Sequence, residues 1–237
     1  MTDRPRISSL GDDCVTVDFG NEISIDVNSK AIALAARLNA DGFEGFIEAV
    51  PAYSSVSVFF KLAEVRRSAQ ELETALASVT RCIDRALENL SDALTSKGRI
   101  VEIAVDFGAQ AALDLEHVAE FARMSQRDVV ELFTSKTYRV YMLGFVPGFA
   151  YMGTVDPRIA APRRSTPRLR VASGSVGIAG GQTGIYLSEL PGGWQLIGRT
   201  LLKPFDPSRA EPCLLKAGDS VQFYPITQPS VRRTATV

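Results

Sequence analysis

The sequence has little of the chemistry that a self-contained active site needs. Its 237 residues include one histidine, His117, and three widely spaced cysteines, Cys14, Cys82 and Cys213, with no Cys-x-x-Cys pair. A single histidine excludes a histidine-rich metal site, and the cysteine spacing supports neither a disulfide framework nor a zinc site. We therefore expect no metal site, buried apolar cysteines and a structural role for His117.

The chain also lacks a strong net charge and a long apolar run. Its formal net charge is −1, which gives no bulk electrostatic attraction to nucleic acid or to an anionic membrane. No apolar run approaches the roughly 18–20 residues of a spanning helix. Residues 1–5 lack the apolar centre of a signal peptide. We expect a cytoplasmic protein that binds neither nucleic acid nor membrane.

The first 95 residues show mixed strand and helix patterns. Alternating or β-branched segments predict strands, and apolar residues at intervals of three and four predict helices. The predicted strands cover residues 14–19, 22–27, 46–50 and 54–60. The predicted helices cover residues 28–39, capped by Asn28 or Ser29, and 66–94. This order indicates a small α+β domain, with a boundary at the polar segment 91–99.

The second part of the chain consists mainly of short β segments separated by glycine and proline. A strand is expected at residues 100–107, followed by two short helices at 113–123 and 126–133 with Asp114 and Ser125 as possible caps. Further strands are expected at residues 138–143, 176–179, 184–187, 195–199 and 220–224. Many short strands with such turns are typical of a closed barrel or a sandwich.

Glycine and proline are concentrated in one region. Eleven of the 18 glycines lie between Gly144 and Gly198, and eight of the 12 prolines lie between Pro147 and Pro212. Glycine permits backbone conformations and close approaches that other residues avoid. We interpret this region as a set of shaped loops at the surface.

The segment Gly180–Gly184 reads Gly-Gly-Gln-Thr-Gly and has two interpretations. One is a tight turn between barrel strands. The other is a cradle in which backbone N–H groups beside Gln182 bind a ligand. The segment is not a P-loop, because no Gly-Lys-Ser/Thr follows, and it does not open a dinucleotide-binding helix.

Arginines and aromatic residues accompany these glycines. Four arginines, Arg163, Arg164, Arg168 and Arg170, lie within eight residues. They form either a solvated loop or a site for carboxylate or phosphate, which the planar guanidinium pairs bidentately. Phe145, Phe149, Tyr151 and Trp194 are predicted to wall a cleft or a partner interface, with core packing as the alternative.

Four segments of this half resemble one protein family. They are Tyr138–Gly153, Thr166–Tyr186, Pro191–Pro207 and the closing run Lys216–Ile226. The resemblance is to the family of the B subunit of bacterial 5-oxoprolinase, also called allophanate hydrolase subunit 1. That family includes an inhibitor of a sporulation histidine kinase and part of the carboxyltransferase domain of urea carboxylases. It often has histidine where this chain has Phe133.

The resemblance implies an α+β N-terminal domain over residues 1–95 and a cyclophilin-like β-barrel domain with two short helices over residues 96–237. It also implies an enzyme of several different chains. In that enzyme the B subunit works with two partners, which are a TIM-like-barrel A subunit and a homologous C subunit. Together they convert 5-oxo-L-proline to L-glutamate at the expense of ATP. The ATP is expected to be bound by the complex, since this chain has no nucleotide motif.

The expected site is a glycine-rich cleft in the barrel. We assemble no Ser-His-Asp set around the one histidine, so no catalytic residue is assigned and an active site shared with another chain is expected. Two alternatives remain: an inhibitor that binds a sensor histidine kinase, and a carboxyltransferase component acting on urea or a related amide. The predicted substrate- or anion-binding residues are Arg168, Arg170, Gln182, Thr183 and Arg199, and the predicted cleft walls are Gly144, Phe145, Gly148, Phe149, Gly181 and Trp194.

Overall fold

The structure is a computed structural model that describes residues 4–70, 73–88, 90 and 98–226. The chain divides into two compact units. The first contains the residues up to Arg99 together with 140–143 and 216–219, and the second contains 100–139, 144–215 and the residues from Ser220 onward. The predicted boundary after residue 95 falls in the segment 91–97, outside the described residues.

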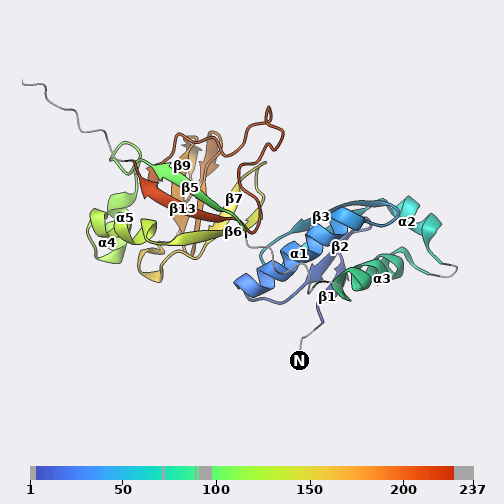
Figure 1. The fold of residues 1–237 in the computed structure, drawn as a ribbon. Coiled ribbons are helices and arrows are strands. Elements are labelled where there is room, and N and C mark those ends of the chain that lie inside the picture. Colours follow the sequence, from blue (N-terminus) through green and yellow to red (C-terminus); the bar gives the residue numbers. More distant parts are fainter. Residues whose placement is uncertain (1–3, 71–72, 89, 91–97, 227–237) are drawn as a thin grey trace, which may run out of the picture. The chain divides into compact units, whose positions relative to one another are not determined.

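The first unit is built on a four-stranded antiparallel sheet in the order β1-β2-β4-β3 (Figure 1). Alternate residues of β4 are buried, as expected for a strand with one face on a core. Valines of β2 and β4 pack with apolar residues of α1 and α3 in one cluster. The elements are β1 Arg6–Ser9, β2 Cys14–Asp18, α1 Ile25–Asp41, β3 Phe46–Pro51, β4 Ser55–Phe60, α2 Leu62–Ser68 and α3 Ala75–Glu88.

The predicted strand at residues 22–27 is wrong, because α1 already begins at Ile25. Ser24 is the N-cap, and its hydroxyl accepts a hydrogen bond from the Val27 amide at 3.2 Å. The side chains of Ile23 and Ile25 are mostly exposed. The alternation of Ile23, Ile25 and Val27 therefore resembled a half-buried strand, although these side chains do not form a buried face.

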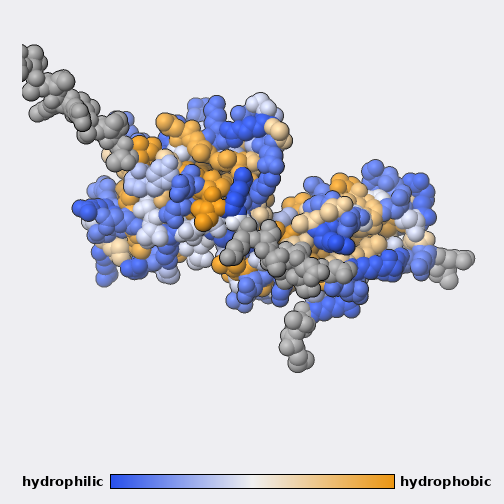
Figure 2. All heavy atoms as spheres, viewed as in Figure 1, coloured by the Kyte–Doolittle hydropathy of each residue, from blue (hydrophilic) through white to orange (hydrophobic). Residues whose placement is uncertain are grey.

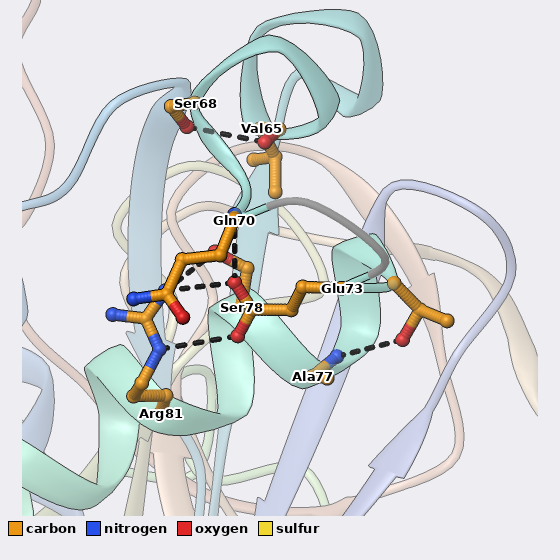
Figure 3. Close-up of polar contacts among 8 residues, drawn as sticks. Val65, Ser68, Gln70, Glu73, Ala77, Ser78 and Arg81 are labelled. Atoms are coloured by element: carbon orange, nitrogen blue, oxygen red, sulfur yellow. Dashed lines mark hydrogen bonds and ion pairs between the residues drawn. The ribbon is translucent and has the colours of Figure 1, made fainter.

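The single long helix predicted for residues 66–94 is also wrong in its extent. The described part forms two helices, because the chain leaves the helical conformation at Ala69. Glu73 then accepts two hydrogen bonds from Arg81, at 3.1 and 2.9 Å, and one from the Gln70 amide (Figure 3). These bonds tie the connection between the helices to α3. Leu72 and Leu94 lie outside the described residues.

The second unit is a nearly closed barrel made from one seven-stranded mixed sheet in the order β12-β9-β10-β7-β6-β13-β5 (Figure 1). Strands β13 and β5 are parallel. The two edges meet where Asp106 and Arg199 exchange backbone hydrogen bonds of 2.7 and 2.8 Å. A barrel, and not a sandwich, is thus the arrangement of these short strands.

The barrel unit contains most of the remaining elements. Of the five α-helices in the described residues, α4 and α5 belong to this unit. Strands β8 and β11 form a separate two-stranded sheet. The bounds are β5 Ile100–Val105, α4 Leu115–Ala122, α5 Gln126–Thr134, β6 Thr137–Leu143, β7 Ala150–Gly153, the 3-10 turn Pro157–Ile159, β8 Arg168–Val171, β9 Ser175–Ala179, β10 Gln182–Ile185, β11 Leu190–Gly192, β12 Gln195–Arg199 and β13 Ser220–Pro225.

Phe133 lies in the core of the barrel unit. It is fully buried, and its ring stacks on Tyr138 and Phe223 with centroid distances of 4.9 and 5.1 Å. The Tyr138 hydroxyl donates to the Phe133 carbonyl at 2.8 Å. Phe133 therefore occupies a core position in this chain.

Both predicted helices of this half are present, but only one predicted cap is confirmed. Ser125 forms a capping box with Asp128. Asp114 stands at the start of α4 without making a side-chain capping bond. No helix within the described residues is long and apolar enough to cross a membrane. Hydrophobic residues are nevertheless visible on the surface of both units (Figure 2).

Candidate functional site

The main candidate site is an aromatic pocket of about 280 Å³ in the barrel unit. Its residues come from β7 and the loop before it, the loop before β8, the residue that follows β10, and β11 with the β11–β12 connection. The lining residues are Phe145, Phe149, Tyr151, Arg163, Pro167, Tyr186, Pro191, Gly192, Gly193 and Trp194. We call this the aromatic pocket below.

Phe149 organises the walls of the aromatic pocket. It is buried, and it makes edge-to-face contacts with four other rings, at centroid distances of 4.9–6.0 Å. Edge-to-face pairs stabilise beyond the area that they bury, because the positive ring edge meets the negative ring face. The partner rings are those of Phe145, Tyr151, Tyr186 and Trp194. The walls are thus held in place before any ligand arrives.

The loop Gly144–Phe149 places one ring at the pocket mouth. The Gly144 amide donates to the Phe149 carbonyl at 3.0 Å, which closes a tight turn. Phe145 has a φ of 69°, which is uncommon for a residue with a side chain, and it is 62% exposed. Gly148 also has a positive φ, and a Cβ there would lie 2.9 Å from Phe205. The turn therefore requires glycine at 148.

Arg163 is the only charged residue among the ten that line the aromatic pocket. Its guanidinium carbon lies 5.9 Å from the centroid of the Trp194 ring, within the range of a cation–π contact. Within the described ranges no carboxylate forms an ion pair with it. A positive charge is thus held against the aromatic wall.

The neighbouring arginines have partners in the chain. Asp114, which is 4% exposed, accepts two hydrogen bonds from Arg168 at 2.8 and 2.7 Å and one from Arg164 at 3.1 Å. It also accepts the Leu196 amide hydrogen bond at 2.7 Å. One carboxylate therefore ties the loop that carries Arg163 to α4 and to strand β12. This role replaces the predicted cap.

The structure gives each predicted anion-binding arginine an internal contact. Arg168 is paired bidentately with Asp114. Arg170 forms an exposed ion pair with Glu189 at 3.3 Å, and Arg199 donates from Nε to the Ser173 carbonyl at 2.9 Å. None of the three lines the aromatic pocket. Their roles in ligand binding remain predictions.

The Gly180–Gly184 segment forms a tight turn, the first of its two interpretations. Gly180 and Gly181 connect β9 to β10, with Gln182 opposite Ala179. The buried Thr183 hydroxyl donates to the Gly177 carbonyl at 2.9 Å. Neither Gln182 nor Thr183 lines the aromatic pocket, nor do Gly144, Gly148 and Gly181. Of the predicted cleft walls, the pocket brings together Phe145, Phe149 and Trp194. Phe149 and Trp194 also belong to a buried hydrophobic cluster, so the alternative of core packing holds for these two rings.

Tyr186 is a pocket residue that the sequence reasoning missed. Its side chain is buried, and this burial raises the pKa of the Tyr186 hydroxyl above its usual value. A Cβ on Gly192 would collide with this hydroxyl, so glycine is required where β11 passes it. A signal for Tyr186 is present in the sequence, since it follows the glycine-rich hairpin, but a strand pattern alone does not separate wall residues from core residues.

A second, more polar pocket of about 200 Å³ adjoins the loop before β8. It is lined by His117, Pro162, Arg163, Arg164, Ser165 and Gln195. Gln195 is buried, and its amide donates to the Pro162 carbonyl at 2.8 Å. Arg163 lines both pockets. Among the described residues there is no group of three or more His, Cys, Asp or Glu side chains that could hold a metal ion.

Acid should weaken the barrel unit through Asp114. Burial by itself raises the pKa of this carboxyl. The hydrogen bonds from Arg168 and Leu196 and the charges of the nearby guanidiniums lower the pKa by more than burial raises it, so the pKa of Asp114 lies below its usual value. A depressed folded-state pKa stabilises the fold above the unfolded pKa of about 4, and this contribution is lost as the pH falls through the folded pKa.

We expect the free energy of unfolding, followed by Trp194 fluorescence in urea, to fall as the pH is lowered from about 5 to about 3. Asp114→Asn removes this titrating group, so its stability should depend less steeply on pH over the same interval. Equal slopes for the two proteins would show that the Asp114 carboxylate contributes nothing to acid sensitivity.

Sequence and fold comparisons agree on the family. The family model described as carboxyltransferase domain, subdomain C and D, matches residues 5–215. The chain belongs to this family. It is 44% identical over 229 residues to the 5-oxoprolinase B subunit of Bacillus subtilis, covering 96% of the chain and 95% of that protein. The corresponding protein of Escherichia coli O157:H7 is 39% identical over 222 residues, covering 94% of the chain and 96% of that protein.

A solved structure supports the same family assignment. The crystal structure of TTHA0988 matches with a TM-score of 0.77 and 34% identity, over 91% of this chain. The chain spans 40% of the length of TTHA0988. The resemblance found in the sequence motifs is thus confirmed for this member of the carboxyltransferase C and D family.

Proposed function

We propose that this chain is one subunit of an ATP-dependent 5-oxoprolinase. The enzyme would convert 5-oxo-L-proline, ATP and water into L-glutamate, ADP and phosphate. The observation that carries the proposal is the 44% identity to the 5-oxoprolinase B subunit of Bacillus subtilis over nearly the full length of both chains. The aromatic pocket is proposed to contribute to the substrate site, with Phe145, Phe149 and Trp194 as its walls.

The need for ATP follows from the chemistry of the substrate. A lactam amide is unreactive, and transfer of phosphate to its carbonyl oxygen would create a better electrophile for attack by water. The sequence contains no P-loop. We therefore assign ATP as a substrate of the complex and do not assign a nucleotide site to this chain.

The proposal includes partner chains. The aromatic pocket contains rings and one guanidinium but no histidine, cysteine or carboxylate among its ten lining residues. It therefore offers neither a general base nor an activated nucleophile of the usual kinds. Two partners, a homologous C subunit and a TIM-like-barrel A subunit, are proposed to complete the active site. The cyclophilin-like description of the barrel and a cytoplasmic location are parts of the same proposal.

A reconstitution assay tests the proposed function. We would measure ADP and glutamate formation from 5-oxo-L-proline with this chain alone, with each candidate partner, and with both partners together. Activity is expected only in the full mixture. Full activity of the isolated chain would contradict the shared site. A complex confirmed by gel filtration but without 5-oxoproline-dependent ATP hydrolysis would contradict the proposed reaction.

The family description supports a second candidate, a carboxyltransferase component acting on urea or a related amide. Such a component needs a carboxylated biotin carrier from another chain. Carboxyl transfer to urea by the reconstituted complex, in place of 5-oxoproline cleavage, would favour it. Inhibition of a sensor histidine kinase remains a prediction from the resemblance.

A further inference from the structure

We propose that Arg163 is the anion-binding residue of the aromatic pocket, which takes a small carboxylic acid with a flat ring or amide plane. The ring would lie in the aromatic pocket, and the carboxylate would pair with the guanidinium. That this ligand is 5-oxo-L-proline rests on the proposed function. The class of ligand follows from the pocket itself.

The charges around the pocket single out Arg163. The two arginines nearest to it in sequence, Arg164 and Arg168, share the buried carboxylate of Asp114. Arg170 has its own exposed partner, Glu189. Arg163 is exposed, lines the pocket and has no carboxylate partner within the described ranges. It is therefore the cation with hydrogen-bonding capacity left for an incoming anion.

The cation–π contact of Arg163 with Trp194 is compatible with this role. Such a contact is electrostatic and uses none of the five N–H donors of the guanidinium. These donors match the two oxygens of a carboxylate. The contact at 5.9 Å thus holds the cation beside the pocket and reduces the side-chain entropy lost when a ligand binds.

The chain that follows Arg163 is held in place by two contacts. The Arg164 amide donates to the Gly193 carbonyl at 2.7 Å, and Arg168 is held by Asp114. Pro167 of the same loop also lines the pocket. The backbone position of Arg163 is therefore set by its neighbours in the chain. The segment 163–168 contributes both the charged residue Arg163 and the apolar residue Pro167 to the pocket lining.

Binding can be followed directly, because Trp194 is the only tryptophan of the chain. We would titrate the full chain with 5-oxo-L-proline and with its neutral isostere 5-oxo-L-prolinamide, and record Trp194 fluorescence. A second pair, furan-2-carboxylate and furan-2-carboxamide, tests the ligand class without assuming the proposed enzyme substrate. In each pair the acid is expected to bind more tightly than the amide.

Substitution of Arg163 should remove this preference. Loss of a charged hydrogen-bonded pair predicts about tenfold to a hundredfold weaker binding of the acids to Arg163→Gln. Binding of the neutral amides should change little, and Arg163→Lys should recover part of the preference. The matched control is Arg127→Gln, which removes an exposed arginine of α5 that is not among the lining residues.

The outcomes separate this inference from the proposed function. An acid-to-amide preference that persists in Arg163→Gln, or no binding of any probe to the wild-type chain, overturns the inference. If the assembled enzyme cleaves 5-oxoproline and Arg163→Gln leaves its KM unchanged, the function stands and the inference fails. If the furan pair shows an Arg163-dependent preference while no assembly cleaves 5-oxoproline, the inference stands and the function fails.

Discussion

Replacement of Asp114 by alanine is expected to lower the free energy of unfolding of the barrel unit by about 3 kcal/mol. This is the low end of the range for breaking a buried ion pair, because both guanidiniums keep some contact with solvent. The substitution leaves Arg168, Arg164 and the Leu196 amide without their shared acceptor. Urea unfolding followed by Trp194 fluorescence measures the loss.

The matched control for Asp114→Ala is Glu131→Ala. Glu131 pairs with Arg127 on the surface of α5, where both side chains are mostly exposed. Exposed pairs contribute about 0–1 kcal/mol. If the two substitutions lower the free energy of unfolding equally, Asp114 does not anchor the loop before β8.

The Asp114→Ala protein should also bind the acidic probes less tightly, since Arg163 is carried by that loop.

Replacement of Phe133 by alanine is expected to destabilise the barrel unit by about 3–5 kcal/mol, the usual cost of removing a large aromatic ring from a core. The ring is fully buried between Tyr138 and Phe223 and also makes an edge-to-face contact with Phe107 at 6.3 Å. Its loss leaves a cavity that the surrounding strands can close only in part. Chemical denaturation of the full chain, read at Trp194, gives the difference.

Phe133→Leu is the control, because it retains most of the apolar volume and should cost clearly less than Phe133→Ala. Phe133→His introduces the residue that the resemblance implies at this position. It places a polar ring among Tyr138, Phe223 and Phe107, so it should also destabilise the fold. An unchanged or higher stability of Phe133→His would contradict the assignment of this position to a purely apolar core.

Local sequence patterns predicted most of the barrel. The strands β6, β9, β12 and β13 coincide closely with predicted segments, and α4 and α5 lie within a residue or two of their predicted bounds. These elements have clear periodicity and are bounded by glycine, proline or a cap. In the barrel, the strand predicted at residues 184–187 lies two residues earlier, as β10 Gln182–Ile185, and β7 was not predicted. Elsewhere the errors came where the pattern was short, as at residues 22–27, or where a turn without glycine or proline interrupted it, as after Ser68.

The candidate site was predicted only in part. The aromatic walls could be predicted, because Phe145, Phe149 and Trp194 stand among glycines and prolines. The anion-binding arginine could not, because all four arginines of residues 163–170 have the same local sequence pattern. Their difference depends on which of them a carboxylate neutralises. The carboxylate that decides this, Asp114, lies 50 residues from Arg164 and 54 from Arg168.

The sequence by itself determined the family, the short-stranded character of the second unit and the scarcity of catalytic side chains, since these depend on residue identity and local spacing. Only the tertiary structure decided that the buried Asp114 carboxylate binds Arg164, Arg168 and the Leu196 amide. It also decided that Gly180 and Gly181 form the turn between β9 and β10, and that Arg163 lies near Trp194 at a pocket. The physical reason is that pairing, burial and ring contacts join residues distant along the chain, and local periodicity carries no information about such contacts.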